Sequence, residues 1–236
     1  MEEEKTSEEL DNPGVTHTSS GIAFDIDSEK KIRVLLVSNK GDIKPGTQSK
    51  PDLRGKSCGV GFPTGGRQTC ETNIGALERE YEDESGFRVG SVVWHLGDIP
   101  KRDKQRRVVN IIHEYLVAVT DMYQVDIREK SEISKAEWML LRDVFLAPNA
   151  DWDHPEGVYL SHKRRLAEVS RQLYNMSDDE LVKMPEAFQE WYIPIQEVLE
   201  KEMDELIKDG ILPLKNPPMN SRRTRLRSHD RYAVRV

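Results

Sequence analysis

The chain has 236 residues, enough for one domain with extensions or for two small domains. Hydrophobic residues make up 36% and charged residues 33% of it, a low apolar share that predicts solvated tails. No run approaches the roughly 20 apolar residues of a membrane helix, and the acidic start Met1-Glu2-Glu3-Glu4 is unlike a signal peptide. Cys58 and Cys70 form no CxxC pair, so we expect reduced thiols in a cytoplasmic protein without a membrane partner.

The two ends carry opposite charge within a net charge of −7. Glutamates dominate residues 1–17, which we expect to be an acidic disordered tail. Arginines dominate residues 213–236, a basic C-terminal tail. A basic tail could hold RNA, an acidic partner or the acidic tail of a neighbouring subunit, but a solvated or self-associating terminus is the favoured interpretation, and nucleic acid is an unlikely partner.

The chain between the tails reads as an α/β domain over residues 18–175. Apolar stretches at 21–26 and 31–37, separated by Asp27-Ser28, predict a hairpin. A Gly- and Pro-rich loop follows, and then a short strand from Val60 into a turn at Gly65-Gly66. Helical spacing that stops at Gly86 predicts a helix from Asn73 to Ser85.

Strands are expected at 87–96 and 108–119 and near Glu137-Trp138, followed by a helix over 157–174. Residues 176–212 form a predicted helical extension, which opens with a capping box of Ser177 and Glu180. We expect its apolar stripe to pack on the preceding domain, and the alternative interpretation is a homodimer contact.

A cluster of carboxylates marks the predicted helix. Glu80, Asp83 and Glu84 lie three and four residues apart, so they share one face of its last turns. Three negatively charged side chains on one face repel one another, and a bound cation relieves that repulsion. Carboxylate oxygens are hard ligands, which suit Mg²⁺ or Mn²⁺. We expect Gly65 and Gly66 to adopt positive φ and approach the helix, and Gly86 to let the chain leave it. On charge pattern alone, an ordinary solvated acidic face explains the cluster at least as well.

The spacing of these residues resembles the Nudix box, Gly-x5-Glu-x7-Arg-Glu-U-x-Glu-Glu-x-Gly-U, in which U is a bulky apolar residue. The fixed positions that match are Gly65, Glu71, Arg79, Glu80, Glu84, Gly86 and Phe87, with Tyr81 at the first U. Asp83 departs from the pattern because it replaces the first glutamate of the pair, and its shorter side chain favours contact with a metal through water. The flanking Phe62-Pro63-Thr64 resembles the entrance of Nudix domains, and the resemblance covers roughly residues 18–170.

The resemblance implies an α/β/α sandwich with a mixed sheet and a metal-dependent pyrophosphohydrolase that cleaves a nucleoside diphosphate linked to a moiety X. It implies that Glu80 and Glu84 bind Mg²⁺ or Mn²⁺, with Asp83 as an outer ligand. Arg79 would orient Glu80, Glu71 would hold the loop and Gly65 would supply its turn. Several Nudix enzymes use a late-loop glutamate as a ligand or general base, and Glu132 is the candidate here, with Glu129 and Glu137 as rivals and a plain surface loop as the alternative.

Other residues receive structural interpretations. His95 and His113 lie in predicted strands, where buried, hydrogen-bonded histidines are commoner than catalytic ones. The substrate-binding residues and X, such as ADP-ribose, a sugar nucleotide, a dinucleoside polyphosphate or a nucleoside triphosphate, stay open. Two other functions also stay open: a Nudix-like module that senses a nucleotide without cleaving it, and an RNA-end pyrophosphohydrolase that uses the basic tail.

Overall fold

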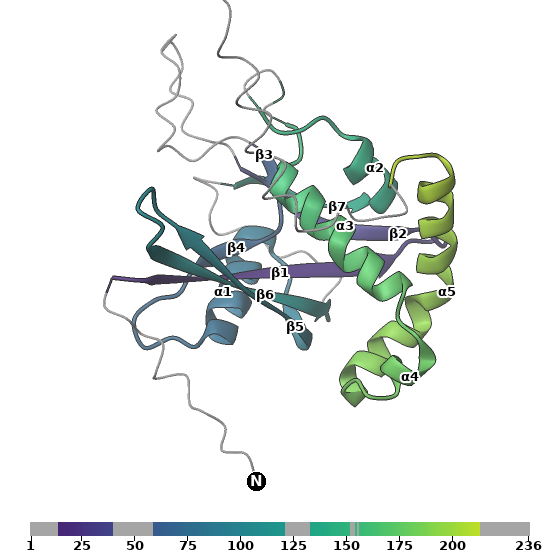
Figure 1. The fold of residues 1–236 in the computed structure, drawn as a ribbon, viewed down its shortest axis with the longest axis horizontal. Helices are drawn as coiled ribbons and strands as arrows, with labels where there is room; N and C mark the ends of the chain where they lie inside the picture. The colour runs from purple at the N-terminus through teal and green to yellow at the C-terminus, as the bar shows by residue number, and fades with distance from the viewer. Residues whose placement is uncertain (1–13, 40–58, 121–132, 152–153, 155, 213–236) are drawn as a thin grey trace, which may run out of the picture.

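The computed structural model describes residues 14–39, 59–120, 133–151, 154 and 156–212. In this part of the chain seven strands form one mixed sheet, with helices on both of its faces (Figure 1). The elements in chain order are β1 (Thr16–Ile26), β2 (Ile32–Asn39), β3 (Gly59–Gly61), β4 (Thr64–Gly66), α1 (Asn73–Ser85), β5 (Val89–Arg102), β6 (Val108–Val119), β7 (Ile133–Leu140), α2 (Leu141–Leu146), α3 (Leu160–Tyr174), α4 (Asp178–Leu181) and α5 (Glu186–Lys208).

Strand β1 organises the sheet because it pairs with three other strands. Its last residues form the predicted antiparallel hairpin with β2, in the register Phe24↔Val34. Its first residues pair with β4, Ser19 lying opposite Gly65. Along most of its length β1 runs parallel to β6, and β6 in turn forms an antiparallel pair with β5. The mixed sheet implied by the Nudix resemblance is therefore confirmed.

Side chains of β1 alternate between two cores. Ala23 faces α1 and joins a small cluster with Leu77 and Tyr81 of that helix. Ile22 and Phe24 face the other way, into a larger cluster that includes residues of α2, α3 and α5. The expected α/β/α arrangement follows from this alternation.

Helix α1 is capped at both ends. The Thr72 side chain accepts a hydrogen bond from the backbone N–H of Gly75, and Gly86 ends the helix in the left-handed conformation at φ 72°. The prediction of a helix over 73–85 and the role expected of Gly86 are confirmed.

Several elements differ from the sequence-based expectation, and Gly65-Gly66, expected as a turn, lie in strand β4. Strand β1 starts at Thr16, inside the segment assigned to the N-terminal tail, because Thr16 and His17 pair with β6. Strand β5 continues to Arg102, the predicted helix over 157–174 starts at Leu160, and a short helix α2 was not expected. The added ends of β1 and β5 pair with distant residues of β6, which local periodicity does not report.

The C-terminal helix α5 belongs to the main core. Leu199, Met203 and Leu206 from the predicted stripe are fully buried in the cluster that also contains residues of β1 and β2. Packing on the preceding domain, the favoured interpretation of this stripe, is thus observed. Among the described helices, none combines the length and apolar character required to cross a membrane.

Candidate active site

The loop from β4 to α1 is held on the helix by one side chain, Arg79. Its guanidinium donates two hydrogen bonds to the carboxylate of Glu71, from Nε to Oε1 (2.9 Å) and from Nη2 to Oε2 (3.0 Å). Nη2 also donates to the carbonyl of Gly66 (2.8 Å), and Nη1 donates to Oε1 of Glu80 (2.6 Å). The hydrogen bonds from Arg79 lower the pKa of Glu71, and those to Glu71 and Glu80 raise the pKa of Arg79. The planar guanidinium of Arg79 therefore holds the loop and the carboxylate of Glu80 in fixed positions relative to each other.

Gly65 is required by the close approach of Glu80. A Cβ atom at position 65 would lie 1.8 Å from Cδ of Glu80 and 2.1 Å from its Oε1, distances at which atoms overlap. The expectation of positive φ at Gly65 and Gly66 is wrong, since neither residue is among those with that conformation; in this loop Cys70 adopts it instead, at φ 64°. The absence of a side chain, rather than an unusual backbone conformation, is what lets Glu80 reach the loop.

Glu84 meets the same short strand four residues further along α1. Its Oε2 accepts a hydrogen bond from the backbone N–H of Thr64 (2.8 Å). The Thr64 hydroxyl is fixed by Ser20 of β1 (2.8 Å) and by the carbonyl of Phe62 (3.0 Å). Glu80 and Glu84 are each only 7% exposed, so two carboxylates are buried side by side between α1 and β4.

The segment between β3 and β4, which leads into the site, rests on His162 of α3. Nδ1 of His162 accepts a hydrogen bond from the backbone N–H of Phe62 (2.8 Å), and the two rings stack with centroids 4.8 Å apart. Gly61 permits the contact, because a Cβ there would lie 2.7 Å from the imidazole. Burial lowers the pKa of His162 to about 4, so the ring is neutral and able to accept at neutral pH.

These carboxylates fit a hard divalent cation. Two acidic side chains one helical turn apart repel each other, and burial makes that repulsion more costly unless positive charge is close. Arg79 contacts one oxygen of Glu80, and the backbone N–H of Thr64 contacts one oxygen of Glu84. Carboxylate oxygens on one helix are donors of the type that Mg²⁺ and Mn²⁺ take, together with water and phosphate oxygens.

The family model of the NUDIX domain matches residues 16–161 of the chain. The chain belongs to the NUDIX family. It is accordingly a hydrolase that acts on pyrophosphate bonds, and divalent metals are the usual cofactors of this family.

Solved structures with the NUDIX fold resemble it at low sequence identity. A NUDIX hydrolase from Nitrosomonas europaea is 18% identical over 55% of this chain and 75% of that chain, with a TM-score of 0.41. The NUDIX domain of Shewanella oneidensis NrtR in complex with ADP ribose is 16% identical over 72% and 99% of the two chains, with a TM-score of 0.46. NrtR in complex with a 27mer DNA is 17% identical over 90% and 83%, also at 0.46. No curated protein matches the chain.

Most of the residues assigned to the NUDIX box from the sequence lie together. Gly65, Glu71, Arg79, Glu80 and Glu84 form the connected group described above. Asp83 is half-buried on the same helix. Glu132 and its rival Glu129 lie outside the described residues, whereas the other rival, Glu137, is on β7 and forms an ion pair with Lys135.

Three contributors to the NUDIX loop were missed from the sequence. His162, Ser20 and Gly61 each act through contacts with segments far away along the chain. His162 stands in a helix that was predicted, but nothing in local spacing indicates that its ring accepts from Phe62. The Ser20 contact has a weak signal, because the hydroxyl of Thr64 requires a hydrogen-bond partner.

Replacing Gly65 by alanine should displace Glu80 and lower pyrophosphate hydrolysis by about 100-fold or more, the effect of moving a catalytic group by roughly 1 Å. Gly66→Ala is the matched control, because a Cβ at position 66 meets nothing within 4 Å. Steady-state rates of both variants, with circular dichroism to verify folding, check this expectation. Equal rates for the two variants would contradict the role of the close contact.

His162 should make stability depend on pH in a defined window. Its pKa is 6.5 before burial and about 4 in the folded chain, so the unfolded chain binds the extra proton between these values. The contribution is complete above pH 6.5 and is lost as the pH falls towards 4. Denaturant unfolding across this range should show a loss of stability in the native chain that is smaller in His162→Asn, whose amide oxygen can still accept from Phe62. The exposed His154, replaced by asparagine, is the control, and identical pH profiles for all three proteins would refute the assignment.

Proposed function

We propose that the chain is a Mg²⁺-dependent pyrophosphohydrolase, with Mn²⁺ as a substitute, that cleaves a nucleoside diphosphate linked to another moiety. The observation that carries the proposal is the burial of Glu80 and Glu84 side by side, with Arg79 and the Thr64 amide each holding one oxygen. A buried pair of carboxylates at this position supports a metal site better than a solvated acidic face, because exposed glutamates would repel each other less.

Each residue of the group has a proposed role that follows from its contacts. Glu80 and Glu84 hold the metal, and Asp83, shorter and half-buried, contacts it through water. Arg79 orients Glu80, and Glu71 anchors Arg79 to the loop. Gly65 leaves the space that Glu80 occupies. A bound divalent ion would neutralise phosphate charge and lower the pKa of water that attacks phosphorus.

A general base must take the proton from that water. We propose Glu132 for this role, since it precedes β7 in the chain, and a carboxylate of the box as its alternative. Replacement of Glu132 by glutamine separates the two: loss of turnover with metal binding intact assigns the base to Glu132.

The substrate class is tested by a panel of compounds in the presence of Mg²⁺ or Mn²⁺. Nucleoside triphosphates, ADP-ribose, sugar nucleotides, dinucleoside polyphosphates and capped RNA should include one class that is hydrolysed. Glu84→Gln should lower kcat/KM for that class by about 100-fold or more, because several kcal/mol of charge stabilisation are lost with a metal ligand. A chelator should abolish turnover.

Glu78→Gln is the matched control, since Glu78 is an exposed glutamate of the same helix. It should leave turnover within about twofold of the native rate, the effect of a typical surface change. Metal-independent turnover, or equal loss in both variants, would contradict the proposed site. Binding of a compound of the panel without hydrolysis would instead favour the nucleotide-sensing alternative.

A further inference from the structure

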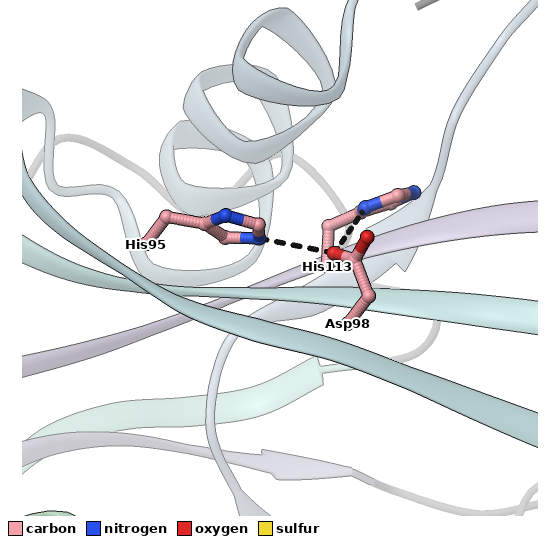
Figure 2. A group of neighbouring side chains, drawn as sticks. All are labelled: His95, Asp98 and His113. Carbon is pink, nitrogen blue, oxygen red and sulfur yellow. Dashed lines mark hydrogen bonds and ion pairs between the residues drawn. The ribbon is translucent and has the colours of Figure 1, made fainter.

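A second group of side chains with metal-ligating atoms lies on the strands β5 and β6. Oδ1 of Asp98 is 3.0 Å from Nε2 of His95 and 2.8 Å from Nδ1 of His113. One ligand atom from each of the three residues lies within 4.8 Å of the others. Figure 2 shows both imidazole rings directed at the Asp98 carboxylate.

The irregularity of β5 creates this group. Residues three apart on a regular strand point to opposite faces, so His95 and Asp98 would normally be separated by the sheet. The register of β5 on β6 shifts between His95 and Gly97, and Gly97 adopts φ 125°, which favours glycine. The shift is a β-bulge, and it turns His95 onto the face of Asp98, whose partner across the ladder is His113.

The group is closed on one side and open on the other. The His113 side chain is 7% exposed, whereas those of His95 and Asp98 are 50% and 43% exposed. On the closed side, Nε2 of His113 lies 2.9 Å from Nδ1 of His17, and the two rings stack. This contact orients the His113 ring, as the outer partners of metal-bound histidines commonly do. The open side leaves room for water as a further ligand.

We propose that His95, Asp98 and His113 bind a divalent transition metal ion of the Zn²⁺ type, at a site separate from the NUDIX box. Two imidazole nitrogens and one carboxylate oxygen are donors that such ions take, with water in the remaining position. Two donors on a tetrahedral zinc ion lie about 3.3 Å apart, given bonds of about 2.0–2.1 Å. The separations of 3.0 and 2.8 Å from Asp98 to the two histidines need only a small opening, and the ligand atoms of His95 and His113 lie within 4.8 Å of each other. The exposed side chains of His95 and Asp98 leave room for both adjustments.

The donor chemistry separates the two sites. The box offers carboxylates and suits Mg²⁺, whereas imidazole suits Zn²⁺, Ni²⁺ or Co²⁺ and binds Mg²⁺ poorly. The two regions are connected, since the carbonyl of His17 accepts a hydrogen bond from the backbone N–H of Arg67, directly after β4.

Zinc binding by the full chain in excess Mg²⁺ tests the site. Competition with a chromophoric chelator should show one bound Zn²⁺ equivalent, and Co²⁺ should give visible d–d absorption typical of a four-coordinate site. His95→Asn and His113→Gln should each weaken Zn²⁺ binding by at least about tenfold. Loss of a residue that only supports a ligand already costs about that much, and loss of a ligand itself should cost more. His95→Asn is the more informative variant, because the exposed position tolerates substitution.

His154→Asn is the matched control, because His154 forms an exposed ion pair with Asp151, also three residues away. It should bind Zn²⁺ as the native chain does, and so should Glu80→Gln, which alters the box alone. Equal Zn²⁺ affinity in His95→Asn and His154→Asn would overturn the proposal, as would the absence of a stoichiometric Zn²⁺ ion in excess Mg²⁺. Loss of the Zn²⁺ ion in Glu80→Gln would place it at the box and overturn the proposal as well.

Discussion

The bidentate contact between Arg79 and Glu71 is the interaction on which the rest of the candidate site depends. It joins the loop after β4 to α1, and the same guanidinium reaches Glu80. Glu80 receives one of these hydrogen bonds directly, whereas Glu84 is held by the backbone N–H of Thr64 in β4, the strand that leads into the loop. A guanidinium group suits this role, since it supplies several directional hydrogen-bond donors and partly offsets the negative charge of the carboxylates around it.

The sheet places this unit and explains why the surrounding core is asymmetric. Strand β1 carries the loop by pairing with β4, and its alternating side chains divide the interior between α1 and the larger layer of α2, α3 and α5. His162 connects that larger layer to the entrance of the loop through Phe62. The geometry of the site is therefore supported from both faces of the sheet, and the helix α5 contributes to it indirectly as part of the main core.

Local signals predicted the parts of the fold that local physics controls. The end of α1 at Gly86 and the hairpin of β1 and β2 follow from neighbouring residues, and both are confirmed. The parallel pairing of β1 with β6 is a contact between distant segments, so no periodicity reveals it. In the site, the box spacing pointed to Glu80 and Glu84, which are buried on one helix, and their role as metal ligands stays a prediction. The reason expected for Gly65 was wrong, because the constraint is the space that the Glu80 carboxylate occupies and not a positive φ. The bulge in β5 similarly hides the proximity of residues 95 and 98, which regular strand spacing places on opposite faces.

The most direct test of this account is a double-mutant cycle on Arg79 and Glu71, measured as kcat/KM for the substrate class that the panel identifies. The account predicts that Glu71→Gln lowers the value by about tenfold or more in the native chain but by less than about threefold in Arg79→Ala, a coupling within the 0.5–3 kcal/mol range of contacting residues. Additive effects of the two changes would contradict it, since they would show that Glu71 acts independently of the guanidinium that it holds.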